Sequence, residues 1–237
     1  MRFLIFILLI SAACCFAQES YRVIQNPKTE KVDILPAQQT LFILDYSNSM
    51  NETLGGATKY SLLLESLKII LSNINEQHKI GVRVYGHRWG FTPIDACRAS
   101  SLIVPIGKNN VENITSSLAK LSPKGMTPIT YSLKQAVKND FKETNTDKHI
   151  ILITDGGENC DESPCEYVME LVKYRKDIRI DVIALNIDND DDMAQLRCVA
   201  KVTKGELYSA NTHAELIKSM NSAFKSKKQV DAKIIGN

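Results

Sequence analysis

Two short runs of wholly apolar residues, far apart in the chain, constrain the fold more than any other feature. Leu41–Leu44 and Ile150–Ile153 contain only aliphatic and aromatic side chains. Runs of this length without polar alternation are typical of strands buried on both faces of a sheet. Such strands need helices on both faces, so the sequence favours an α/β fold built on a mostly parallel sheet.

The sequence from residue 41 to residue 224 alternates between strand and helix patterns. We expect strands at residues 41–44, 80–85, 101–106, 149–154, 178–187 and 206–208, and helices at 62–71, 111–121, 128–137, 164–176, 192–202 and 213–224. The second and third strands are joined by a loop in which we expect no helix, which predicts an antiparallel pair at the sheet edge, where Pro105 is tolerated. The prediction is a doubly wound, Rossmann-like sheet of six strands in the order 3-2-1-4-5-6 with one antiparallel edge strand.

The N-terminus has the layout of a secretory signal peptide. Arg2 precedes an apolar run from Phe3 to Ile10, and Ala17 is a small residue at the expected cleavage point. A membrane anchor is the alternative, although the run is shorter than the roughly 20 residues of a spanning helix. Attachment to a membrane by a lipid on Cys14 or Cys15 is a further alternative. We expect a signal peptide at 1–17, an N-terminal arm at 18–39, one domain at 40–225 and a tail at 226–237, in an exported protein located in the periplasm, at the cell surface or outside the cell.

The charge balance points away from nucleic acid. The chain has 29 Lys and Arg residues against 27 Asp and Glu, and removal of residues 1–17 takes away only Arg2. A nearly neutral domain gives no electrostatic reason to bind nucleic acid or an anionic membrane.

Oxygen-bearing side chains follow the strands at the edge where a doubly wound fold places its ligands. Asp45, Ser47 and Ser49 come directly after the first strand, Thr127 follows Gly125 at the start of a helix, and Asp155 ends the fourth strand. Alternate residues of an extended chain point the same way, so the two serines can aim their hydroxyls at one point. A donor set of oxygen atoms alone suits Mg²⁺, Ca²⁺ or Mn²⁺ better than Zn²⁺, and Mg²⁺ is the preferred prediction. The alternative is a helix N-cap at Asp45-Tyr-Ser-Asn-Ser.

These residues resemble the von Willebrand factor type A domain, the family that includes the integrin inserted domains. The likeness covers nearly all of residues 40–225 and rests on Asp-x-Ser-x-Ser, a later Thr after Gly, and the Asp that ends the fourth strand. It implies a metal-ion-dependent adhesion site in which Ser47, Ser49 and Thr127 touch the metal directly. Asp45 and Asp155 would then act largely through water and hydrogen bonds. The strings Arg83–Arg88, Gly157–Cys160 and Leu196–Ala200 resemble exported bacterial members most.

The cluster of oxygen donors, with no plausible catalytic group beside it, predicts a binding protein and not an enzyme. The expected partner is a protein that supplies an Asp or Glu to an open position on the metal, and no small-molecule substrate is expected. The alternatives are a metal-dependent hydrolase and a scaffold with an idle metal site. Position 47 counts against a phosphohydrolase with an Asp nucleophile, because it is Ser where such an enzyme would carry an acid.

Four cysteines remain beyond residue 17, and an even number in an exported protein predicts two disulfides. In the expected strand order Cys97 and Cys198 lie about three strand spacings apart, roughly 15 Å, which is too far for a bridge. We therefore prefer Cys97–Cys160 with Cys165–Cys198, and a local Cys160–Cys165 bridge is the rival. The acidic run at residues 188–192 is interpreted as a solvated loop that caps a helix at Asp192, and a second calcium site is the alternative.

Overall fold

The computed structural model describes residues 39–75, 77–141 and 146–225. The predicted signal peptide, arm and tail lie outside these ranges, apart from Gln39. Among the described residues, no helix has both the length and the apolar character that crossing a membrane requires.

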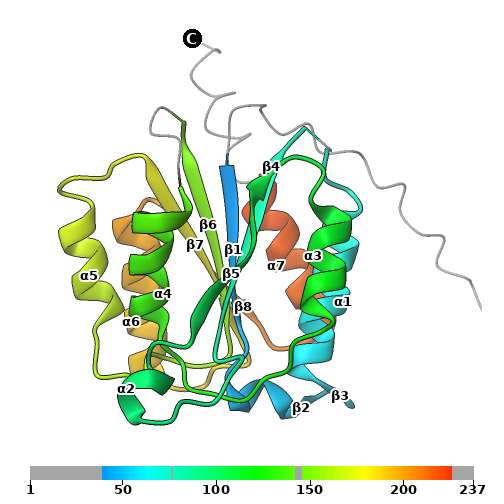
Figure 1. The fold of residues 1–237 in the computed structure, drawn as a ribbon, viewed down its shortest axis with the longest axis horizontal. Helices are drawn as coiled ribbons and strands as arrows, with labels where there is room; N and C mark the ends of the chain where they lie inside the picture. The colour runs from blue at the N-terminus through cyan, green and yellow to red at the C-terminus, as the bar shows by residue number, and fades with distance from the viewer. Residues whose placement is uncertain (1–38, 76, 142–145, 226–237) are drawn as a thin grey trace, which may run out of the picture.

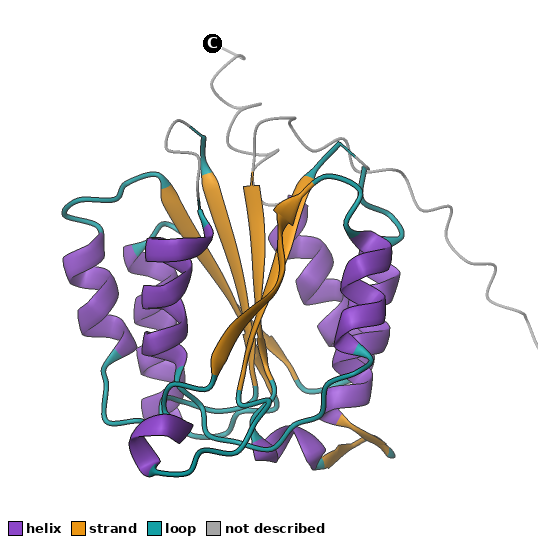
Figure 2. Cartoon of the chain, viewed as in Figure 1, coloured by secondary structure: helices purple, strands orange, loops and turns teal. Residues whose placement is uncertain are grey.

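A six-stranded sheet forms the centre of the molecule, with helices on both faces (Figures 1 and 2). Its strands are β1 (Gln39–Asp45), β4 (Lys79–Tyr85), β5 (Ser100–Gly107), β6 (Lys148–Thr154), β7 (Ile178–Leu185) and β8 (Leu207–Ala210). Their order is β5-β4-β1-β6-β7-β8, and only the β4–β5 pair is antiparallel. The predicted order and antiparallel edge strand are confirmed.

Within the described ranges, three helices cover each face of the sheet. Helices α1 (Lys59–Leu71), α3 (Val111–Leu118) and α7 (His213–Lys225) cover one face, and α4 (Ile129–Gln135), α5 (Pro164–Leu171) and α6 (Asp190–Val202) cover the other (Figure 1). Strand β1 is buried along its whole length because it contributes to both cores. Phe42 and Leu44 pack with the α1 side, and Leu41 and Ile43 pack with the α4 side. This two-sided burial explains why the run lacks polar alternation.

The connections depart from the sequence prediction in three places. The β4–β5 loop contains a four-residue helix, α2 (Pro93–Ala96), which Thr92 caps by accepting a hydrogen bond from Asp95 N. A 3₁₀ turn, η1 (Asn48–Asn51), precedes a hairpin of two very short strands, β2 (Thr53–Leu54) and β3 (Ala57–Thr58). Helix α4 continues as one π-helical segment, η2 (Ala136–Asp140), whose last carboxylate pairs with buried Arg83 of β4.

The predicted cap of helix α6 is wrong. Its N-cap is Asn189, whose side chain accepts a hydrogen bond from the Asp192 backbone, so the helix begins two residues earlier than expected. The three consecutive aspartates at 190–192 then occupy its first turn, where negative charge is favoured by the helix dipole.

Buried His78 makes the stability of this fold pH-dependent. Its Nε2 lies 2.8 Å from Thr40 Oγ1, and burial, with a smaller contribution from His149, lowers its pKa to about 4. Between pH 6.5 and 4 the unfolded chain therefore binds a proton at this position that the folded chain does not, so stability falls as the pH falls through this window. We expect His78 to account for a loss of about 2 kcal/mol between pH 7 and 4.5.

Urea unfolding of the wild type and of His78→Gln at both pH values isolates this contribution. The variant keeps a group that can bond Thr40 but does not titrate, so its loss of stability should be smaller by that amount. An equal loss in the two proteins would show that His78 is not responsible.

Candidate metal centre

Asp45 is held at the carboxyl end of β1 by hydrogen bonds from two directions. Its Oδ1 accepts from Ser47 N at 2.7 Å, and its Oδ2 accepts from Thr154 Oγ1 of β6 at 2.8 Å. The residue is fully buried. Burial and the charge of Asp155 raise its pKa to about 6, although the hydrogen bonds from Ser47 and Thr154 act in the opposite direction. A carboxylate in this position is poorly compensated and would be stabilised by a nearby cation.

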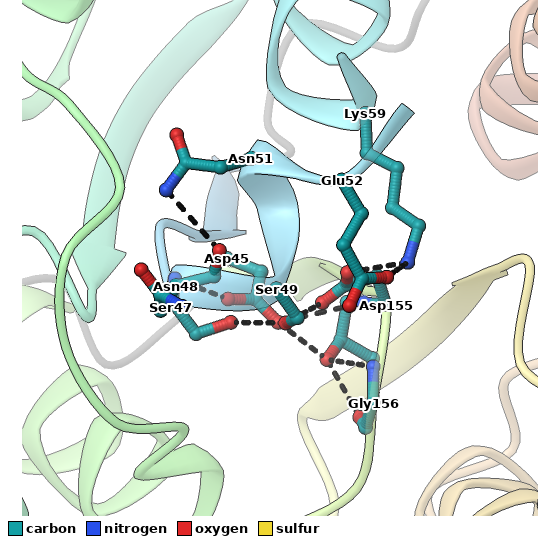
Figure 3. Close-up of polar contacts among 10 residues, drawn as sticks. Asp45, Ser47, Asn48, Ser49, Asn51, Glu52, Lys59, Asp155 and Gly156 are labelled. Atoms are coloured by element: carbon teal, nitrogen blue, oxygen red, sulfur yellow. Dashed lines mark hydrogen bonds and ion pairs between the residues drawn. The ribbon is translucent and has the colours of Figure 1, made fainter. Parts of the chain in front are cut away.

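A chain of short contacts joins the two serines to the second carboxylate (Figure 3). Ser47 Oγ lies 3.0 Å from Ser49 Oγ, and Ser49 Oγ donates to Asp155 Oδ1 at 2.7 Å. Asp155 directly follows β6, which pairs in parallel with β1, so both carboxylates emerge at the same edge of the sheet. The structure thus brings Asp45, Ser47, Ser49 and Asp155 into one hydrogen-bonded group.

The loop that carries Thr127 joins this group through backbone contacts of Gly125. Gly125 O accepts from Asn48 N at 3.0 Å, and Gly125 N donates to Gly86 O at 2.7 Å. Gly86 has a φ of +70°, and a Cβ there would lie 2.6 Å from Ser47 N. Only glycine at this position therefore allows the loops that carry Ser47, Gly86 and Gly125 to meet. Thr127, two residues after Gly125, is buried.

A fourth loop, after β6, supports Thr127 and the start of α4. Asn159 Oδ1 accepts from Thr127 N at 2.7 Å, and Glu158 Oε2 accepts from Thr130 N at the same distance. The next residue, Cys160, is bonded to Cys97 of the β4–β5 loop. The second disulfide joins Cys165 and Cys198, so the preferred pairing is confirmed.

Lys59 is part of the site, although it is not among the site residues that the sequence predicts. Its Nζ donates to Asp155 Oδ2 at 2.9 Å and to Glu52 Oε2 at 2.8 Å, and the side chain is almost entirely buried (Figure 3). Burial alone would lower its pKa, but the hydrogen bonds and charges of Glu52 and Asp155 outweigh this, and the net effect is a raised pKa. A signal existed in the sequence. Lys59 precedes Leu62 and Leu63 by three and four residues, which places it on the apolar face of a helix, in a first turn where a cation is disfavoured.

The charges and donor atoms of this group fit a hard divalent cation. Two buried carboxylates face each other, and one ammonium, shared with Glu52, offsets only part of their charge. Within the described ranges no group of three or more His, Cys, Asp or Glu side chains is placed to hold a metal ion. A metal here would therefore depend on serine and threonine hydroxyls beside the carboxylates, a donor set suited to Mg²⁺, Ca²⁺ or Mn²⁺.

We expect Lys59→Gln to increase the affinity of the site for Mg²⁺. The variant removes the positive charge that faces Asp155 but keeps a side-chain group that can donate a hydrogen bond to it. Charges a few ångströms apart near a protein surface interact by a few kcal/mol, so the dissociation constant should fall by about tenfold or more. Isothermal titration calorimetry with MgCl₂ measures the change.

Glu52→Gln is the matched control for this prediction. It removes the other, solvent-exposed partner of Lys59 and should change the Mg²⁺ affinity only slightly. If Lys59→Gln bound Mg²⁺ no more tightly than wild type, the ammonium would not be opposing the metal.

Comparisons with known proteins agree with this architecture. The family described as von Willebrand factor type A domain matches residues 38–209. The uncharacterized protein YwmC of Bacillus subtilis (strain 168) is 28% identical over 196 residues, which cover 81% of this chain and 84% of that protein.

Solved structures share the fold at low sequence identity. One is proximal thread matrix protein 1 from the mussel byssus, solved with zinc in its metal-ion-dependent adhesion site (MIDAS) motif. It is 21% identical with a TM-score of 0.62, and the match covers 80% of this chain. This chain spans only 45% of the mussel protein. A von Willebrand factor type A protein from Catenulispora acidiphila gives a TM-score of 0.63 at 17% identity, covering 79% of this chain and 42% of that one.

Proposed function

Because the chain belongs to the von Willebrand factor type A family, we propose that it binds a protein partner through a divalent metal ion at the carboxyl edge of its sheet. The residues proposed to hold the ion, directly or through water, are Asp45, Ser47, Ser49, Thr127 and Asp155. One observation carries the proposal, namely the hydrogen-bonded group in which two buried carboxylates and two serine hydroxyls converge from β1 and β6. The mussel protein, whose MIDAS motif holds zinc, supports a divalent ion at such a site.

In this proposal the metal supplies a Lewis-acidic centre with a position open to an anion, and the protein supplies its orientation. Asp45 and Thr154 fix the carboxyl end of β1, Ser47 and Ser49 present hydroxyls, and Asn159 holds the Thr127 loop. Carboxylates that act mainly through water leave the ion with residual positive charge. An Asp or Glu of the partner would then complete its coordination. We propose Mg²⁺ as the ion, with Ca²⁺ and Mn²⁺ as alternatives.

We further propose that the protein is exported and acts by binding, without enzymatic activity. Two disulfides fit an oxidising compartment. The side chain two residues after Asp45 is the hydroxyl of Ser47, which supports a binding role over a phosphohydrolase with an Asp nucleophile.

Binding measured with and without metal tests the proposal. The purified chain is titrated with a peptide that contains one Glu, in MgCl₂ and in EDTA, and a peptide with Gln at that position is the control. Binding should require both Mg²⁺ and the Glu side chain. Equal binding in Mg²⁺ and EDTA would contradict the proposal.

A scaffold with an idle site is a second candidate, and Lys59 is the observation that favours it. The ammonium already pairs with Asp155, and an internal cation of this kind can take the place of a metal. In that case wild type would bind no Mg²⁺ and Lys59→Gln would gain binding, whereas the main proposal requires binding in both.

A further inference from the structure

The edge of the sheet that carries the candidate metal centre also carries an unusual concentration of exposed apolar side chains. Trp89 is 70% exposed, Phe91 is fully exposed, Ile94 is 66% exposed and Met126 is 38% exposed. We call these four residues the apolar rim. Seven large hydrophobic residues are exposed in the described part of the chain, and four of them belong to this rim. Exposed apolar groups gathered in one place commonly mark binding surfaces.

The rim adjoins the candidate metal centre through the backbone. Met126 precedes Thr127, and a Cβ on Gly125 would lie 2.6 Å from the carbonyl oxygen of Arg88, the residue before Trp89. Gly125 also bonds Asn48, between the two serines of the site. Helix α2, which carries Ile94, lies at the same end of the sheet as the hairpin that follows the serines (Figure 1). A polypeptide that reached the metal would therefore lie next to Met126 and the loop that carries Trp89.

The loop that presents the rim is built to hold these side chains outward. Asp95 accepts a hydrogen bond from Phe91 N and pairs with Arg88, and Thr92 caps α2. The Cys97–Cys160 disulfide then ties the end of α2 to the loop after β6. Because this conformation is fixed by specific contacts, the apolar residues are presented to solvent by the fold itself.

The charges beside the rim indicate the chemistry of what covers it. Arg98 and Lys124 flank the rim, and neither has an acidic partner among the described residues, while the backbone of Lys124 bonds Tyr46 and Gly86 at the metal centre. A pocket of about 460 Å³ lies between α2, α4 and the loop after β6, and its lining includes Ile94, Arg98 and Tyr131 together with the acids Asp161 and Glu162. Arg98 and Lys124, beside an apolar surface, suit an acidic segment that also carries a large apolar side chain, whereas the acids of the pocket do not contribute to that preference.

We propose that the partner segment places a large aliphatic or aromatic residue on the apolar rim, within about two positions of the Asp or Glu that it supplies to the metal. This inference rests on the proposed function and adds a second contact that selects among acidic partners. The metal would require the acid, and the rim would determine which acidic sequences bind.

Selection from a displayed library of random twelve-residue peptides tests the inference. The purified chain is presented in MgCl₂, and the recovered peptides should share an Asp or Glu with a large apolar residue nearby. The affinity of one such peptide is then measured for wild type, for a rim variant (Trp89→Ser, Phe91→Ser and Ile94→Ser) and for a control variant (Met169→Ser and Tyr174→Ser), which removes exposed apolar groups elsewhere. We expect about a tenfold or greater loss of affinity in the rim variant alone, with its Mg²⁺ binding retained.

The possible failures can be told apart. Peptides with an acid but no apolar preference, or equal affinity for the rim variant, would overturn the inference and leave the proposed function intact. Peptides that bind equally in MgCl₂ and in EDTA would overturn the proposed function, and with it the inference that depends on an acid bound to the metal. A wild-type dimer in sedimentation equilibrium that dissociates in the rim variant would identify a second copy of the chain as the occupant, and would also overturn the inference.

Discussion

Replacing Asp45 by Asn should weaken Mg²⁺ binding about 100-fold while leaving the metal-free protein at least as stable as wild type. The two effects have one origin, because Asp45 is a fully buried carboxylate whose raised pKa reflects burial and the neighbouring charge of Asp155. In the absence of metal, the charged form is less favourable in the folded protein than in the unfolded chain, so ionisation of Asp45 at neutral pH reduces the stability of the fold. An Asn can still accept from Ser47 N through Oδ1, and its Nδ2 can donate to Thr154 Oγ1, which in turn donates to Gly156 O.

The expected magnitudes are large enough to measure independently. In EDTA we expect a gain in the free energy of unfolding on the order of 1–2 kcal/mol, from the removal of a buried charge. In MgCl₂ we expect a loss of metal affinity of about 100-fold, because a group that orients metal ligands has been neutralised. Urea unfolding in EDTA and calorimetric titration with MgCl₂ provide the two values.

Asp188→Asn provides the matched control, since it removes an exposed carboxylate from the acidic run at residues 188–192. It should change neither quantity. A wild-type level of Mg²⁺ binding in Asp45→Asn would exclude Asp45 from the site, and a large loss in Asp188→Asn would instead favour the second calcium site considered for that run.

The sheet was predictable because its signals are local. Strand β1 and strand β6 each bury both faces, so their apolar runs stand out without knowledge of their neighbours. Helix α2 gave no such signal, because four residues are too few to show periodicity and its stability comes from the Thr92 cap and Pro93. The hairpin β2–β3 depends on the positive φ angles of Gly55 and Gly56, and its two-residue strands show no alternation.

In the candidate site too, the residues that are close in sequence were predictable and the contact between distant residues was not. Asp45, Ser47 and Ser49 share one loop, so their spacing alone predicts that they converge. Lys59 meets Asp155 across 96 residues of sequence, and that contact exists only because α1 packs beside the β1 loop. The donor set could thus be predicted from the motif, whereas the charge that balances it could not.

Removing the Cys97–Cys160 disulfide should weaken both stability and metal binding, whereas removing Cys165–Cys198 should weaken stability alone. The bridges close segments with sequence separations of 63 and 33 residues. In the chain-entropy account, each Ser/Ser double variant should therefore lose about 4 kcal/mol of stability, with the shorter loop losing slightly less. Urea unfolding under non-reducing conditions measures both losses.

Only the first bridge adjoins the residues that support Thr127. Cys160 follows Asn159, whose side chain accepts from Thr127 N, and Glu158, which bonds Thr130 at the start of α4. Cys165 and Cys198 join α5 to α6, away from these contacts. We expect the Cys97→Ser/Cys160→Ser variant to bind Mg²⁺ about tenfold more weakly in calorimetry, and the other variant to bind it as wild type does. The two variants should have similar stability, so they differ mainly in which loops they release. Equal Mg²⁺ affinity in the two would therefore mean that the loop after β6 holds Thr127 in place without the Cys97–Cys160 bridge.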